Sequence, residues 1–307
     1  MPKETWLQML FIVGMVLVGC SIPLLIITLI RRLRGNEIRS MWIKYGSWFI
    51  IFPVFTLPIF IDPRAMQALF LVMSIIAFGE YARAVGLWKE RAHMWLGRIC
   101  IVLVYVAVYI KSFGLLMSVP AYVVVLIFLL PIFRDKYHGM IQRTCLTMLG
   151  VIYFGWFLAH LAFLLNIDTG RQLILAFMLI VVVNDAAAYI IGSNLGRRRM
   201  LPNISPNKTW EGALGAMIIA MGTTIGVRFA LYDMSIGIAI LLGFLLAFGG
   251  TCGDLAISVI KRDVQIKDTG SLIPGHGGLL DRLDSVLFVS PIFFHFMNAF
   301  YITEINL

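Results

Sequence analysis

The sequence predicts an all-α protein, a polytopic bundle of about nine or ten membrane-spanning helices. The composition is the first observation in favour, because 60% of the 307 residues are apolar and only 13% are charged, against roughly 45–50% and about 25% in soluble proteins. The second is that the apolar residues form long runs, and the third is that basic residues gather in alternate loops between those runs. Such a chain is suited to a lipid bilayer.

Ten apolar runs approach the length of about 20 residues that a helix needs to cross a bilayer. The first is longer than the apolar part of a signal peptide and is followed at once by Arg31, Arg32 and Arg34, so we expect it to be retained. The second and third runs, and likewise the fourth and fifth, are short and closely joined, which leaves open that one pair is a re-entrant or interfacial hairpin. In chain order the runs cover residues 6–30, 45–61, 65–79, 97–110, 113–133, 145–165, 172–192, 212–231, 236–257 and 285–301.

The basic residues indicate which loops face the cytoplasm, because cytoplasmic loops carry an excess of Lys and Arg. Alternation of the ten runs places 20 of the 25 basic residues on one side, in the loops around Arg34, Arg91, Lys136, Arg198 and Lys267. We therefore expect both termini outside. The same loops account for the net charge of +9 and would lie against anionic lipid headgroups. Nucleic-acid binding is not expected, because no soluble domain is available to carry it.

The segment from residue 258 to residue 284, which we call the charged segment, carries a high density of both charges between two apolar runs. Acidic and basic groups together at a membrane surface can bring a phosphate-bearing substrate to a divalent cation. The segment therefore suggests an enzyme. Its charged residues are Lys261, Arg262, Lys267 and Arg282 with Asp263, Asp268, Asp281 and Asp284, and His276 stands in a glycine turn with Gly277 and Gly278.

An acid within the seventh run points to a second part of the site. Asp185 adjoins Asn184 and lies four residues before Tyr189, hence on the same helix face. A carboxylate inside a membrane span costs roughly 2.5–3.5 kcal/mol on the insertion scale, so this one needs a partner or a function. The alternative is an acid near the interface that simply reaches water.

Asp254 stands near the end of the ninth run, after several glycines. Helical spacing places Asp254, Ser258 and Lys261 on one face, where a carboxylate, a hydroxyl and an ammonium group could surround a metal-bound phosphate. Ordinary close packing of membrane helices is the alternative explanation of the glycines, which are Gly249, Gly250 and Gly253.

A polar loop between the seventh and eighth runs is the third part. We expect a turn at Ser205 and Pro206, and Thr209 is suited to cap the helix that follows. Lys208 and Glu211 would then lie at the membrane surface. Solvated charges at a helix start are the alternative, but the loop lies on the same side as the charged segment, which favours a functional role.

Several common catalytic motifs do not occur in the sequence. HExxH, GxxxxGK[ST], GxSxG and GxGxxG are missing, which argues against a zinc protease, a P-loop NTPase, a hydrolase elbow and a Rossmann dinucleotide fold. The four cysteines stand singly, without the spacing of a zinc site or a disulfide framework. Phosphate binding would therefore depend on Lys and Arg, with a hard cation held by Asp254, Asp281 and Asp284.

The charged segment resembles the long signature of phosphatidate cytidylyltransferases, also called CDP-diacylglycerol synthases. The segments NDAAAYIIG and SPNKTWEG resemble two other stretches typical of that family. The resemblance covers only the C-terminal part of the chain, so we divide the chain into N-terminal membrane helices, residues 1–144, and a catalytic membrane domain, residues 145–307. The residues that carry the signature are Ser258, Lys261, Arg262, Lys267, Asp268, the run 274–278, Asp281, Arg282, Leu283 and Asp284.

The resemblance implies transfer of the cytidylyl group from CTP to phosphatidic acid, with CDP-diacylglycerol and pyrophosphate as products. It also implies Mg2+, with a second cation beside it left open, held by Asp254, Asp281 and Asp284 with Asp185 completing the shell. Lys208 and the basic residues of the charged segment would bind the triphosphate or the lipid headgroup, and His276 would either donate to a phosphate oxygen or fix the glycine turn. The catalytic set is then Asp254, Lys261, Arg262, Asp281, Arg282 and Asp284, and the substrate-binding set is Asn184, Asp185, Tyr189, Ser205, Lys208, Thr209, Glu211, Ser258, Lys267, Asp268, His276, Gly277 and Gly278.

Other functions stay open. A paralogue acting on another lipid phosphate is one, since Asn207 stands where many relatives have a second basic residue. An ion-coupled transporter would also place acids in membrane helices, but near the midplane of inverted repeats, and we find no repeat. A scaffold would not need the charged segment, and the motif of CDP-alcohol phosphotransferases is missing. We expect a multi-pass protein of a bacterial inner membrane, with the active site facing the cytoplasm, and leave a homodimer open.

Overall fold

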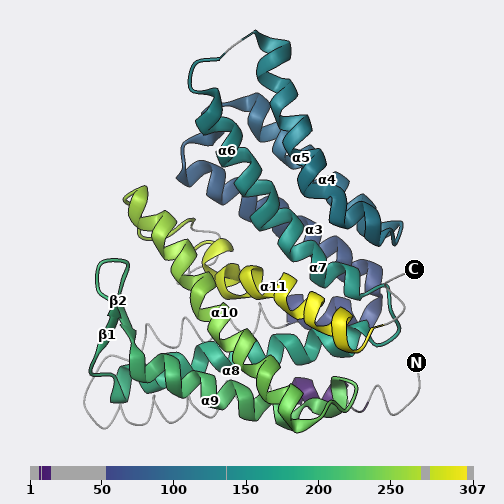
Figure 1. The fold of residues 1–307 in the computed structure, drawn as a ribbon, viewed down its shortest axis with the longest axis vertical. Coiled ribbons are helices and arrows are strands. Elements are labelled where there is room, and N and C mark those ends of the chain that lie inside the picture. The colour runs from purple at the N-terminus through teal and green to yellow at the C-terminus, as the bar shows by residue number, and fades with distance from the viewer. Residues whose placement is uncertain (1–6, 8, 15–52, 136, 271–276, 303–307) are drawn as a thin grey trace.

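The computed structural model describes residues 7, 9–14, 53–135, 137–270 and 277–302, and in these parts the chain is a bundle of long helices with one small hairpin (Figure 1). The predicted run 6–30 and the start of the run 45–61 fall largely outside the described residues. Residues 53–61 are helical. The helices that follow are α3 (Pro63–Ala84), α4 (Arg91–Tyr109), α5 (Phe113–Arg134), α6 (Met140–Gly150), α7 (Phe157–Leu164), α8 (Gly170–Leu195), α9 (Trp210–Gly226), α10 (Ile236–Asp263) and α11 (Leu280–Phe300).

Seven helices among the described residues are long and apolar enough to cross a membrane. One of them is continuous from α6 to α7 through a π-helical turn, η2 (Val151–Trp156). The helices α4 and α5 each qualify alone, so the fourth and fifth predicted runs do not favour a re-entrant hairpin. The helix α9 has 17 residues, somewhat short of a full span. The all-α, polytopic prediction is confirmed, and the boundary expected at 144/145 falls inside α6.

The polar loop before α9 contains a hairpin that the sequence analysis did not predict. Strand β1 (Arg199–Leu201) pairs antiparallel with β2 (Ser205–Thr209). The expected turn at Ser205 and Pro206 is therefore wrong, because the chain turns at residues 202–204 instead. A strand of a two-stranded ribbon has an unpaired edge, so a proline without an N–H group is tolerated in it. The expected cap is confirmed, since the Thr209 hydroxyl accepts from the Gly212 amide at 3.2 Å.

Figure 1 shows two groups of helices joined by α11. The helices α3 to α7 pack together, as do α8, α9 and α10, and α11 packs against α10 on one side and α7 on the other. The glycines of α10 pack closely against α11, which agrees with the alternative explanation given for them. A Cβ atom at Gly253 would lie 2.5 Å from the Asp284 carbonyl oxygen, and one at Gly249 would lie 2.8 Å from Val289. These contacts bring the polar end of α10 against the start of α11.

The α3–α7 group contains a proline whose effect on its helix is compensated from a neighbouring helix. Pro120 lies inside α5, so the carbonyl of Leu116, four residues earlier, lacks an intrahelical N–H partner. The indole Nε1 of Trp156 donates to that carbonyl at 2.7 Å. A carbonyl without a hydrogen bond is costly in a bilayer. The contact removes that cost and joins the π-helical turn to α5.

Replacement of this indole tests the compensation. We expect Trp156→Phe to lower the free energy of unfolding by about 1–2 kcal/mol, measured by thermal unfolding in detergent. In a Pro120→Ala background α5 supplies its own N–H group to Leu116, so the same substitution should cost less. An equal loss in both backgrounds would show that the hydrogen bond is not the cause.

Candidate functional site

Three separate parts of the chain meet at one end of the helix bundle, where α8, α10 and α11 carry acids and the hairpin carries a lysine. Lys208 on β2 places its Nζ 2.7 Å from Asp254 Oδ2 on α10. The same ammonium group donates to the Thr251 carbonyl at 3.3 Å. Arg262, at the end of α10, donates from Nε to the carbonyl of Ile204 in the hairpin turn at 3.1 Å. Lys208 and Arg262 thus each join the hairpin to α10.

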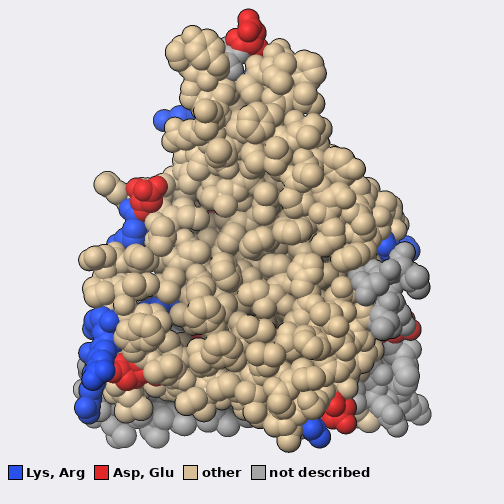
Figure 2. Space-filling view, in the orientation of Figure 1, with Lys and Arg blue, Asp and Glu red and all other residues tan. Residues whose placement is uncertain are grey.

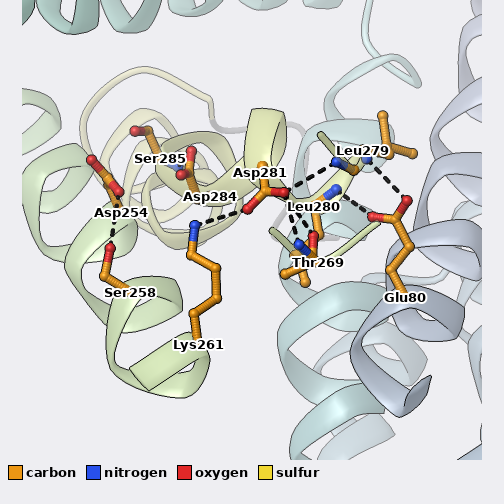
Figure 3. A network of polar contacts seen from close by, with 11 residues as sticks. Glu80, Asp254, Ser258, Lys261, Thr269, Leu279, Leu280, Asp281, Asp284 and Ser285 are labelled. Carbon is orange, nitrogen blue, oxygen red and sulfur yellow. Dashed lines mark hydrogen bonds and ion pairs between the residues drawn. The ribbon is translucent and has the colours of Figure 1, made fainter. Parts of the chain in front are cut away.

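Three carboxylates, Asp185, Asp254 and Asp284, lie close enough to repel one another electrostatically. Asp185 Oδ1 accepts from the Ser285 hydroxyl at 3.3 Å, and Asp284 Oδ1 accepts from the Ser285 amide at 2.8 Å. Ser258 lies one turn along α10 from Asp254, with 3.5 Å between its Oγ and Asp254 Oδ1. Figure 3 shows Asp254, Asp284 and Ser285 side by side. The acid on α8 is therefore joined to those on α10 and α11.

Asp281 differs from these three acids because four protein donors contact it. Lys261 Nζ lies 2.8 Å from its Oδ1. Its Oδ2 accepts from the Thr269 amide at 3.0 Å, from the Thr269 hydroxyl at 3.0 Å and from the Gly278 amide at 3.1 Å. Figure 3 shows this network around the start of α11. Only 8% of the Asp281 side chain and 18% of the Lys261 side chain are exposed, so the pair is largely buried, and Asp281 links Thr269 and Gly278 to the start of α11.

The other predicted residues lie around this centre. Asn184 is buried and donates to Asp185 Oδ1 at 3.3 Å, whereas Tyr189 is 60% exposed. Glu211 accepts from the backbone amides of Arg197 and Arg198 at 3.0 and 3.2 Å, and so closes the base of the hairpin. His276 lies outside the described residues. Ser205 is half-buried in β2, Thr209 is buried, Lys267, Asp268 and Arg282 are exposed, and Gly277 and Gly278 lie in the loop before α11.

The sequence analysis missed one acid of this site. Glu80 lies on α3, is 1% exposed, and its carboxylate accepts from the backbone amides of Leu279 and Leu280 at 3.1 and 2.8 Å. An acid next to an apolar run is a signal of the same kind as Asp185. The predicted run ends at residue 79, one residue before Glu80, so Glu80 was not recognised as an acid of a membrane helix.

The carboxylate oxygens of this site suit a hard cation such as Mg2+, which prefers oxygen ligands. Among the described residues no three His, Cys, Asp or Glu side chains are already arranged to hold a metal ion. The mutual repulsion of Asp185, Asp254 and Asp284 is nevertheless the kind that a bound cation relieves. Since Asp281 already has several donors, these three acids are the better candidates for ligands.

Comparison with known proteins finds relatives over most of the chain. A family profile described as "Cytidylyltransferase family" matches residues 42–300. The chain is 32% identical over 277 residues to the uncharacterized protein YnbB of Escherichia coli strain K12, covering 86% of this chain and 89% of that protein. It is 40% identical over 131 residues to the phosphatidate cytidylyltransferase of Mycobacterium leprae, covering 43% of this chain and 42% of that protein. It is also 38% identical over 155 residues to the Bacillus subtilis enzyme of the same name, covering 50% of this chain and 57% of that enzyme. The matched region thus spans about half the length of these enzymes.

Proposed function

The chain belongs to the cytidylyltransferase family, whose members are nucleotidyltransferases, and on that premise we propose that it transfers the cytidylyl group of CTP to phosphatidic acid. The observation that carries the proposal is the contact between Lys208 of the hairpin and Asp254 of α10. It brings the SPNKTWEG segment to α10 four residues before the charged segment begins. Ser285, directly after the charged segment, contacts Asp185 of the NDAAAYIIG segment. Basic groups and clustered carboxylates together suit the transfer of a phosphoryl-linked group.

In this reaction an oxygen of the phosphatidate phosphate forms a bond to the α-phosphorus of CTP. The bond from that phosphorus to the bridging oxygen of the β-phosphate breaks, and pyrophosphate leaves with that oxygen. The attacking phosphate is already ionised at neutral pH, so the protein needs to position and neutralise the reactants rather than to remove a proton. Lys208, Arg262, Lys267 and Arg282 would bind the phosphates of both substrates, while Lys261 pairs with Asp281.

We assign the Mg2+ site to Asp185, Asp254 and Asp284, with a second cation beside it left open. A bound ion would neutralise the negative charge of the triphosphate at this site. The crowding of these three carboxylates supports the assignment. The three aspartates would contribute carboxylate oxygens as ligands, while Lys208 holds Asp254 in place.

One assay tests the function. Purified protein in detergent, given radiolabelled CTP, phosphatidic acid and Mg2+, should form a labelled lipid and pyrophosphate in equal amounts. Formation of the lipid product without Mg2+ at an unchanged rate would remove the cation from the proposal. Light scattering on the same sample would decide whether the protein is the homodimer that the sequence left open.

A paralogue acting on another lipid phosphate is the second candidate. It is favoured by the similarity to YnbB, which covers 86% of this chain, whereas the similarity to the Bacillus subtilis phosphatidate cytidylyltransferase covers 50%. The same assay with lysophosphatidic acid and an isoprenoid phosphate in place of phosphatidic acid separates the two. A higher kcat/KM for either would favour the paralogue.

Most of the Lys and Arg visible in Figure 2 lie along the left edge, with a few at the right and lower edges, which supports one predominantly basic face. We propose that this face is cytoplasmic in a bacterial inner membrane. In a background without the native cysteines, Lys267→Cys should react with a membrane-impermeant maleimide only after the cells are permeabilised. Asp233→Cys, in the exposed loop between α9 and α10, should react in intact cells. Labelling of position 267 in intact cells would reverse the topology.

The two basic residues that meet at the hairpin are expected to differ in kinetics. A charge-assisted contact to phosphate contributes about 1.5–3 kcal/mol, so its loss should lower kcat/KM by roughly 10- to 150-fold. We expect Lys208→Ala mainly to raise the KM for CTP and Arg262→Ala mainly to lower kcat. Lys89→Ala, on the same side but away from the site, is the control. If Lys208→Ala changes only the KM for phosphatidic acid, the nucleotide role of Lys208 is wrong.

A further inference from the structure

Glu80 connects α3 to the start of α11 across a large separation in the sequence. One carboxylate oxygen accepts from the Leu279 amide at 3.1 Å and the other accepts from the Leu280 amide at 2.8 Å. The side chain is buried, with 1% of the residue exposed. The first amides of a helix have no partner within that helix and carry the positive end of its dipole. Glu80 therefore satisfies two of them and brings a negative charge to that end.

Two glycines on either side of residues 271–276 leave room for this carboxylate. A Cβ atom at Gly270 would lie 2.6 Å from Glu80 Oε1, and one at Gly278 would lie 2.5 Å from Glu80 Oε2. Both distances are shorter than any van der Waals contact, so neither position accepts a side chain without displacing Glu80. The absence of side chains at Gly270 and Gly278 thus leaves the space that the Glu80 carboxylate occupies.

Glu80 acts beside Asp281, which accepts from the amide that precedes Leu279 in the chain. Asp281 Oδ2 binds the Gly278 amide, so consecutive amides from Gly278 to Leu280 all donate to carboxylates. Asp281 lies in the first turn of α11 and Asp284 lies one turn later. A shift of this turn would move Asp281, and with it Lys261, and also Asp284 relative to Asp185 and Asp254.

We propose that Glu80 is a positioning residue for cytidylyl transfer, which fixes the first turn of α11 and thereby sets Asp284 against the acids of α8 and α10. This inference rests on the proposed function for its catalytic part. Glu80 touches no reacting atom, because its oxygens are engaged by backbone amides. Its effect should therefore fall on kcat, since misplacement of a reacting group by about 1 Å can cost up to about 100-fold in rate.

The test compares Glu80→Gln with a matched change on the same helix. Glutamine keeps the size of the side chain but loses the charge and one acceptor oxygen. Gln67 is also buried on α3, and its Nε2 donates to the Ala162 carbonyl at 3.2 Å and to Asn166 at 3.0 Å, away from the site. Gln67→Leu therefore removes a buried hydrogen-bonding group of α3 without touching α11. Gly278→Ala crowds the Glu80 carboxylate from the other side, and it also crowds the Thr269 hydroxyl, which would lie 2.6 Å from the added Cβ atom.

We expect Glu80→Gln and Gly278→Ala to lower kcat per folded molecule by about 10- to 100-fold, with the KM for CTP changed by less than about threefold. Glu80→Asp keeps the charge and both acceptor oxygens and should retain intermediate activity. Gln67→Leu should lower the melting temperature but leave kcat per folded molecule unchanged. If Glu80→Gln does not fold, Glu80→Asp decides the question by the same readouts.

A second readout does not depend on activity. Hydrogen–deuterium exchange of a peptide covering residues 277–287 should become faster in Glu80→Gln and stay unchanged in Gln67→Leu. An unchanged exchange rate, or a kcat equal to that of the parent protein, would overturn the proposal. If the parent protein does not transfer cytidylyl groups to phosphatidic acid, the proposed function fails, and the exchange measurement alone decides whether Glu80 fixes the start of α11.

Discussion

Asp284→Asn is expected to reduce turnover by more than about 100-fold, the upper range for groups that only support a metal ligand, while the melting temperature stays the same or rises. The two effects have one cause. Asp284 lies close to Asp185 and Asp254, and both the loss of water around its carboxylate and the repulsion among the three carboxylates oppose folding. Removal of one charge relieves that repulsion and at the same time weakens the hold on a cation. A gain of stability with a loss of function is typical of a site built for a ligand.

The measurement pairs steady-state kinetics over a range of Mg2+ concentrations with thermal unfolding in the same detergent. Asp263→Asn is the matched control, because Asp263 is an exposed acid at the end of α10. It should change neither quantity. Near-normal activity of Asp284→Asn at limiting Mg2+ would remove Asp284 from the cation site, and a lower melting temperature would contradict the repulsion on which the prediction rests.

Asp281→Asn is expected to lose both activity and stability. Its carboxylate binds Lys261, Thr269 and Gly278, and the ion pair is largely buried. Removal of one partner from a buried pair costs about 3–5 kcal/mol, because the other charge is left without compensation. The melting temperature should fall accordingly, and turnover should fall because the start of α11 is no longer held.

A second substitution separates the two losses. Lys261→Met in the Asp281→Asn background removes the uncompensated ammonium group, so part of the stability should return while turnover stays low. If Asp281→Asn is as stable as the parent protein, the contacts to Asp281 do not hold the loop in solution. The two aspartates of the signature would then have the same role, as the sequence analysis proposed for them.

The sequence predicted the membrane fold well, but it placed several helix ends too early. The helix α10 begins at residue 236 as expected, yet it ends at Asp263 rather than at residue 257. The helix continues because Lys and Arg are good helix formers, whereas an apolar run reports only the part that lies in lipid. The same reason explains why α3 extends to Ala84 and includes Glu80.

Contacts between residues close in the sequence could be predicted from helical spacing, whereas contacts between residues far apart in the sequence could not. Asp254 and Ser258 were placed on one face from helical periodicity, and the structure brings them together. The hairpin was missed because a Ser-Pro pair is more typical of a turn than of a strand. The contact of Glu80 with Leu280 spans 200 positions, and no local pattern reports such a pairing.

The reach of α3 to the start of α11 also limits how the chain can be divided. A fragment limited to residues 145–307 would contain every family-like segment and still leave the amides of Leu279 and Leu280 without their acceptor. Chimeras with relatives face the same constraint, since a foreign N-terminal half must bring an acid at the position of Glu80 to meet the two glycines of the loop. In evolutionary terms the two parts of this protein are therefore expected to be inherited together rather than exchanged.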